Sequence, residues 1–172
     1  MDSFVEQIVV RKKTLKQVVA VVVVCAIAVF LIGASILLVR ILGLLSALVI
    51  TGVFYGAWYL LTAQNIEYEY CITNDTIDID CIIAQRKRKR MVSVSGKKIE
   101  AAGKYIPAQW QNRKMDRTVV AAPSQNEDNL YYFTYHSKKN GNTLVVFQPD
   151  ERVKNSFYQG LPRLIQLEWD KE

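Results

Sequence analysis

Residues 17–63 read QVVAVVVVCAIAVFLIGASILLVRILGLLSALVITGVFYGAWYLLTA, and this apolar stretch decides how the chain is organised. Its one charged residue is Arg40. A bilayer core of about 30 Å needs roughly 20 apolar residues in a helix, so the stretch is long enough for about two crossings. We therefore predict a transmembrane hairpin of two helices over residues 17–63.

Arg40 determines where this hairpin turns. An arginine at the bilayer centre costs at least about 2.5 kcal/mol on insertion scales, whereas one at the end of a span reaches water. A turn at residues 40–43 gives two adequate spans, while a break at residues 33–35 would leave the first helix too short. A single long helix would leave Arg40 in lipid. A cleaved signal peptide is disfavoured because the first apolar run is too long and a second run follows directly.

Basic residues flank the apolar stretch on both sides. They are Arg11, Lys12, Lys13 and Lys16 before it, and Arg86, Lys87, Arg88, Lys89 and Arg90 after it. Positive charge concentrates on the cytoplasmic side of membrane spans. We therefore expect a two-span protein of the cell membrane with both termini in the cytoplasm. The chain has three cysteines, Cys25, Cys71 and Cys81. An odd number does not indicate a set of disulfides, which fits a reducing compartment.

Residues 1–16 are predicted to be a cytoplasmic amphipathic segment. Phe4, Val5, Ile8, Val9 and Leu15 recur at roughly helical spacing. This spacing indicates either a short helix on the membrane surface or an extension of the first membrane helix.

Gly52 and Gly56 form a small-xxx-small pair in the second predicted membrane helix. Such a pair lets another helix approach closely. The approaching helix is either the first helix of the same hairpin or a helix of a second copy, so a homo-oligomer is one candidate assembly.

Residues 64–172 are predicted to form a cytoplasmic, strand-rich domain. From residue 66 apolar and polar residues alternate, and Asn74 with Asp75 provides a two-residue turn between two strands. The apolar face then carries Ile66, Tyr68, Tyr70, Ile72, Ile77, Ile79, Cys81 and Ile83, and the opposite face carries Glu67, Glu69, Asp78 and Asp80. Further strands are expected at residues 91–94, around 99, and at 118–122, 130–136 and 143–147.

A C-terminal helix is expected to begin after Pro149 and Asp150. Its apolar side consists of Val153, Phe157, Leu161, Leu164 and Ile165. Pro162 lies within this pattern and is expected to kink or break the helix.

Several motifs together resemble a known family. They are MDSFVEQIVVRKKT (1–14), IEYEY (66–70), IDID (77–80) and RKRKR (86–90). Over nearly the whole chain the sequence resembles small bacterial membrane proteins with two transmembrane helices and a bacterial pleckstrin-homology-like domain. The resemblance implies a mainly-β or α+β domain, a twisted sheet or partly open barrel with a C-terminal helix, and brings no activity with it. Eukaryotic domains of this fold that bind inositol phospholipids use basic residues around the first strand turn. This chain has Asn74 and Asp75 there, so that site is not carried over.

The basic run at residues 86–90 has two interpretations. Together with Arg11, Lys12, Lys13 and Lys16, it contacts anionic lipid headgroups at the membrane surface. Alternatively, it neutralises the carboxylates of neighbouring strands. Nucleic acid is not an expected partner, because no aromatic residues interleave with the run.

No motif for catalysis, a metal or a cofactor is recognisable. His136 is the sole histidine and has no nucleophile at a characteristic spacing, and the strand carboxylates lack a compact oxygen-rich loop. We therefore expect a non-enzymatic adaptor that binds an unknown protein partner through its sheet domain. A sheet edge or the loop around Trp110 is the expected contact, although Trp110 would alternatively pack over the sheet. The second functional hypothesis is a module that responds to anionic lipids.

Overall fold

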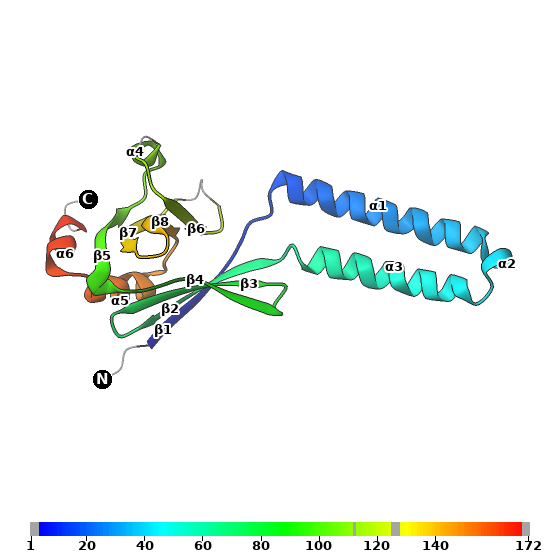
Figure 1. Ribbon diagram of the computed structural model, residues 1–172, viewed down its shortest axis with the longest axis horizontal. Helices are drawn as coiled ribbons and strands as arrows, with labels where there is room; N and C mark the ends of the chain where they lie inside the picture. Colours follow the sequence, from blue (N-terminus) through cyan, green and yellow to red (C-terminus); the bar gives the residue numbers. More distant parts are fainter. Residues whose placement is uncertain (1–3, 112, 125–127, 170–172) are drawn as a thin grey trace. The chain divides into compact units, whose positions relative to one another are not determined.

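The computed structural model describes residues 4–111, 113–124 and 128–169, and the chain divides into two compact units. One unit is residues 12–66. The second unit combines the residues up to Arg11 with those from Glu67 onward. Figure 1 labels the helices and strands of both units.

Residues 12–66 form a helical hairpin of α1 (Leu15–Leu37), α2 (Val39–Leu42) and α3 (Leu45–Thr62). Helices α1 and α3 lie side by side (Figure 1). Both are long and apolar enough to cross a membrane. Only 6% of each apolar window is buried, so these are not core helices of a packed domain.

The hairpin reverses between α1 and α3, in the stretch where the turn was expected. Arg40 is exposed in α2. Gly43 follows it with φ 53°, a left-handed conformation that glycine adopts without steric cost. At the other end, the main-chain N–H of Thr14 donates to the Gln17 side chain over 2.9 Å, which caps the start of α1.

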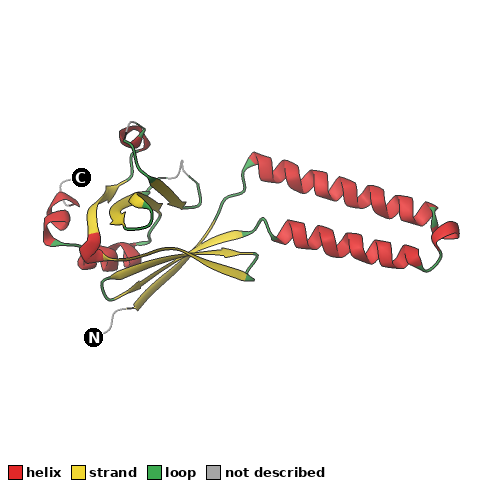
Figure 2. Cartoon of the chain, viewed as in Figure 1, coloured by secondary structure: helices red, strands yellow, loops and turns green. Residues whose placement is uncertain are grey.

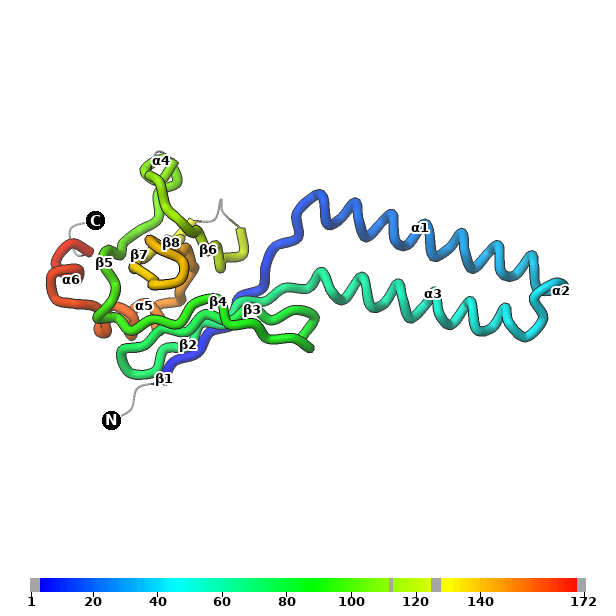
Figure 3. Tube along the Cα trace, viewed as in Figure 1, coloured from blue at the N-terminus to red at the C-terminus, as the bar shows by residue number. Residues whose placement is uncertain are grey.

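The prediction of an N-terminal helix is wrong for the described part of that segment. Phe4–Val10 form strand β1, which pairs antiparallel with β2 (Ile66–Thr73) over its whole length. Figure 3 shows the blue tube of β1 beside β2. Residues 1–3 lie outside the described residues. Neither a surface helix nor an extension of α1 is formed, because the strand main chain finds hydrogen-bond partners along β2.

The side chain of Gln7 fixes β1 to the rest of the domain. Its amide nitrogen donates to the carbonyl oxygen of Gln148 over 3.2 Å, and its amide oxygen accepts from the N–H of Asp150 over 2.7 Å. These two bonds join β1 to the segment between the last strand and the first C-terminal helix. Nothing in the local apolar spacing predicts this tertiary anchor.

The first sheet has the order β1-β2-β3-β4, with β3 (Thr76–Ile83) and β4 (Lys87–Ser95). Asn74, with φ 55°, lies in the predicted turn between β2 and β3. Tyr70, Ile72, Ile77 and Ile79 are all buried, as predicted for the apolar face. Strand β4 begins four residues before the predicted Met91, so most of the basic run lies within a strand.

The second sheet has the order β5-β7-β8-β6. Its strands are β5 (Ile99–Lys104), β6 (Arg117–Ala121), β7 (Tyr131–Ser137) and β8 (Gly141–Phe147), and β6 runs parallel to β8. The short helix η1 (Gly96–Lys98) leads from the first sheet to the second. Figure 2 shows the strands of both sheets in yellow. Within its described residues the domain therefore consists of two four-stranded sheets and not of a closed barrel.

Two helices, α5 (Glu151–Gly160) and α6 (Arg163–Trp169), follow the second sheet. The Asp150 side chain accepts from the N–H of Val153 over 2.8 Å and caps α5. Pro162 breaks the predicted single helix. Because α6 then starts in a new helical phase, Leu164 is 79% exposed and does not join the buried side as predicted, whereas Ile165 is 6% exposed.

Four aromatic side chains join the sheets and α5 into one core. The ring centroids of Tyr70 and Phe147 are 5.7 Å apart, those of Phe147 and Phe133 are 5.5 Å apart, and those of Phe147 and Phe157 are 5.3 Å apart. Edge-to-face pairs at such distances are favourable beyond their burial. Phe147 in β8 is thus the centre of the domain core.

Candidate membrane-contact and partner-contact surfaces

Strand alternation divides the basic run between the two faces of the first sheet. Successive strand residues point to opposite faces. Lys87 and Lys89 therefore lie on the face that also carries Ile79, which we call the core face. Arg88 and Arg90 lie on the opposite face, which we call the outer face.

The two arginines are held by carboxylates of the outer face. Arg88 Nη2 lies 2.8 Å from a carboxylate oxygen of Glu69, and Arg90 Nη1 lies 2.7 Å from one of Asp78. Arg90 also forms an ion pair with Asp80. Glu69 and Asp80 are buried, so their charges need such partners. Arg88 and Arg90 therefore neutralise neighbouring carboxylates, which was one of the two interpretations of the basic run.

The acidic side chains of the outer face also influence one another. Burial raises the pKa of Glu69, the Glu6 side chain and the charge of Asp80 act in the same direction, and the Arg88 guanidinium opposes them. In the described part of the chain, no group of three or more potential ligands is arranged to hold a metal ion. The outer face is a network of carboxylates and arginines.

The cations of the core face have a different environment. Lys87 and Lys89 are exposed, and neither forms an ion pair with a described residue. Burial raises the pKa of the Cys81 thiol, while the charges of Lys89 and Arg11 oppose the shift. Arg11, which follows β1, and Lys89 of β4 therefore both act on the same half-buried thiol. We call Arg11, Lys87 and Lys89 the core-face cations.

A depression of ≈ 330 Å³ lies beside the turn between β3 and β4. Ala84 and Gln85 form this turn with φ 54° and 55°. The side-chain amide of Gln85 donates to Glu67 over 3.2 Å. The lining residues are Glu67, Ile82, Gln85, Arg86, Lys87 and Arg88. Because the Glu67 carboxylate lies in it, the depression is not a purely basic cradle for an anion.

The outermost strand β1 exposes a row of apolar side chains on the outer face. Phe4, Ile8 and Val10 are 62%, 53% and 62% exposed. No described strand pairs with the free edge of β1. This surface was not identified from the sequence beyond the general expectation of a sheet edge. The signal available was FVEQIVV at residues 4–10, which is rich in β-branched residues.

Trp110 is not an exposed partner contact. It ends α4 (Pro107–Trp110), and its ring is buried with the centroid 4.6 Å from that of Tyr132. The Arg113 guanidinium lies 4.9 Å from the centroid of the indole. The buried cluster contains Trp110, Ala122, Leu130, Leu144 and Val146. Trp110 therefore packs over the second sheet, which was the alternative to a contact with a partner.

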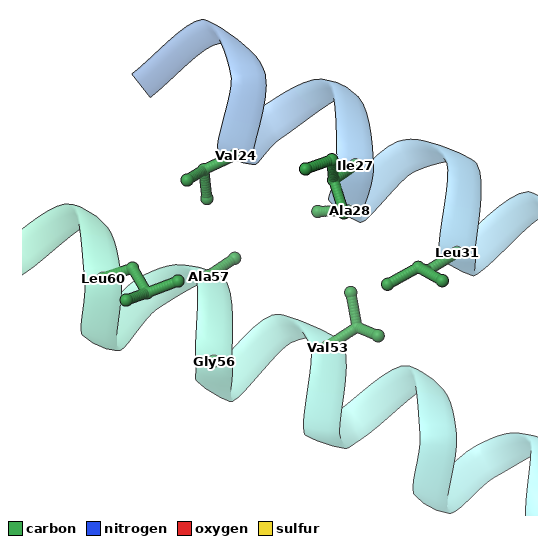
Figure 4. A pocket seen from close by; sticks show the side chains of 8 residues that line it. All are labelled: Val24, Ile27, Ala28, Leu31, Val53, Gly56, Ala57 and Leu60. Carbon is green, nitrogen blue, oxygen red and sulfur yellow. The ribbon is translucent and has the colours of Figure 1, made fainter. Parts of the chain in front are cut away.

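An apolar groove of ≈ 230 Å³ separates part of α1 from α3 (Figure 4). A Cβ atom built on Gly52 or Gly56 would meet nothing within 4 Å. Close packing of these glycines against α1 is therefore not observed. The groove is lined by Val24, Ile27, Ala28, Leu31, Val53, Gly56, Ala57 and Leu60.

The remaining predicted contact residues are all exposed. Lys12 and Lys13 precede α1, Lys16 lies in its first turn, and Arg86 lies in the turn before β4. His136 forms a 2.8 Å hydrogen bond with the side chain of Asn142, its cross-strand neighbour, and so is an ordinary strand residue.

The chain thus combines two helices that are long and apolar enough to cross a membrane with a two-sheet domain and C-terminal helices. Residues 1–166 match the family model described as bacterial PH-like domain (DUF6106), and the chain belongs to this family. No curated protein and no solved structure gives a significant match. The fold class expected from the sequence and the suspected family are thus both confirmed.

Proposed function

We propose that this chain is a non-enzymatic adaptor anchored in the cell membrane by the α1–α3 hairpin, with both termini in the cytoplasm. In this proposal its PH-like domain binds an extended segment of another protein along the free edge of β1. The observation that carries the proposal is the exposed row of Phe4, Ile8 and Val10 on an outermost strand.

The free edge of β1 has the properties of a strand-addition site. An outermost strand offers unpaired main-chain N–H and C=O groups, and an added peptide gains affinity from them and specificity from alternate side chains. Gln7 holds β1 in place through its bonds to Gln148 and Asp150, so the edge is fixed before a partner arrives. A fixed edge lowers the ordering cost of binding.

The opposite edge of the same sheet is protected. Strand β4 presents a run of charged residues, and its pairing with β3 is interrupted by a bulge between Ile79 and Asp80. Charges and bulges are the features that keep edge strands from pairing with other chains. Strand β1 has a single charged residue, Glu6, and no proline. The contrast between the two edges favours β1 as the partner-binding one.

The test is site-specific photo-crosslinking of the full chain in its native membrane. A photoreactive amino acid in place of Ile8 should form an adduct with a partner protein, and one in place of Leu164 should not. Leu164 is the matched control because it is an exposed leucine on α6. An adduct that contains only two copies of this chain would identify the partner as a homo-oligomer.

A substitution links the adduct to the edge. Ile8→Lys removes an apolar contact of about 1.5–3 kcal/mol, so copurification of the crosslinked partner should weaken roughly 10- to 100-fold. Leu164→Lys should leave it unchanged. Equal effects of the two substitutions, or no adduct at Ile8, would contradict the proposal.

A further inference from the structure

We propose that Arg11, Lys87 and Lys89, the core-face cations, bind the anionic phospholipid headgroups of the membrane in which the chain is anchored. This surface lies on the opposite side of the sheet from the apolar row of β1. The inference goes beyond the adaptor function, and it does not depend on a protein partner.

The distribution of charge over the first sheet singles out these three residues. All the carboxylates of its strands, Glu6, Glu67, Glu69, Asp78 and Asp80, lie on the outer face. Arg88 and Arg90 lie among them and are neutralised. The core face at the same end of the sheet carries cations without strand carboxylates. An anionic surface therefore finds uncompensated charge there.

The side chains between the cations also fit a membrane surface. Cys81 and Ile83 are half-buried and lie on the core face opposite Lys89 and Lys87. Arg11 follows β1 at the other edge of the sheet. An apolar strip with cations on both sides matches the boundary between headgroups and acyl chains.

Chain connectivity distinguishes a membrane from other anionic partners. Three residues separate Arg11 from α1, and three residues separate α3 from β2. Extended residues span at most about 3.6 Å each, so each linker reaches no further than about 15 Å. The turn that leads into Lys87 is at the same end of the sheet as these linkers, because β3 returns along β2. Both linkers therefore tether the end of the sheet that carries the cations to the helices of the proposed anchor.

The experiment uses the full chain in lipid nanodiscs with uncharged lipid or with anionic lipid added. Cys25, Cys71 and Cys81 are replaced by serine, and Gln85→Cys at the exposed turn carries a fluorophore. Lipids with a spin label on the headgroup quench the fluorophore when the domain docks. Quenching should be stronger in anionic nanodiscs and should weaken as salt rises.

Two double variants with equal charge change test the site. Lys87→Gln with Lys89→Gln should lower the ratio of docked to undocked domain about 25-fold, since each well-placed cation contributes about a factor of five. Lys138→Gln with Lys139→Gln, exposed on the turn between β7 and β8, should leave it unchanged.

Several outcomes would overturn the inference. One is equal quenching in anionic and uncharged nanodiscs. Another is an equal loss in both double variants, which would mean that net charge alone acts. A third is binding of a labelled oligonucleotide to the chain in uncharged nanodiscs that depends on Lys87 and Lys89, which would assign the surface to nucleic acid.

Discussion

The hydroxyl of Tyr70 connects the two sheets, and Tyr70→Phe should destabilise the PH-like domain. The fully buried hydroxyl donates to the carbonyl oxygen of Ala121 and accepts from the N–H of Gln148 over 3.3 Å. The substitution removes a hydrogen-bond partner from the buried Ala121 carbonyl and from the half-buried Gln148 N–H. Each such group costs about 1–3 kcal/mol, and we expect a loss of about 2–4 kcal/mol in the free energy of unfolding.

Hydrogen exchange of the full chain in detergent measures this loss in the sheets directly. A loss of 2 kcal/mol accelerates exchange of the most protected amides roughly 30-fold. Tyr135→Phe is the control, because Tyr135 is also buried but its hydroxyl makes no hydrogen bond within the described part of the chain. It should change exchange less than about twofold. If the two variants behave alike, the proposed connection between the sheets is wrong.

Three further predictions concern packing and charge. Gly96→Ala should lower the free energy of unfolding of the domain by at least about 1–3 kcal/mol, because the added Cβ would lie 2.0 Å from a main-chain oxygen of α5. The same hydrogen-exchange measurement tests this, and an exchange rate equal to that of the wild type would refute the contact. Ile165→Ala should lower the free energy of unfolding by about 2–5 kcal/mol, and Leu164→Ala should lower it by less than about 0.5 kcal/mol. If Leu164→Ala costs more than Ile165→Ala, the assignment of Ile165 to the buried side of α6 is wrong. The pKa of Glu69 is raised in the folded state. The stability that this shift contributes is therefore fully present below the unfolded-state pKa of about 4.3, and it is lost as the pH rises through the folded-state pKa. The melting temperature of the wild type should therefore fall relative to Glu69→Gln as pH rises from about 4 to about 7, and parallel curves would contradict the shift.

The elements predicted correctly are those that local sequence determines. The length of the apolar stretch and the position of Arg40 predicted two helices and their turn. Alternation around Asn74 predicted the hairpin of β2 and β3, and Asp150 marked the start of α5. Each of these signals lies within a few residues of the structure that it determines.

Most of the errors concern elements that distant partners determine, whereas the error at Leu164 has a local cause. Residues 4–10 fit helical spacing as well as strand spacing, and only pairing with β2 and the bonds of Gln7 make them a strand. Leu164 was misplaced because Pro162 resets the helical phase. The basic run looked uniform in the sequence. In strand β4, successive side chains point to opposite faces of the sheet. Arg88 therefore lies beside the carboxylates, and Lys89 lies on the other face.

The most direct test of the account is the sidedness of the chain. Single cysteines replace Arg40 and Ser137 in turn, after Cys25, Cys71 and Cys81 have been removed, and intact cells are treated with a membrane-impermeant thiol reagent. Position 40 should react from outside, and position 137 should react only after the membrane is opened. If position 137 reacts in intact cells, the PH-like domain is not cytoplasmic, and both the adaptor function and the headgroup contact on the cytoplasmic side are wrong.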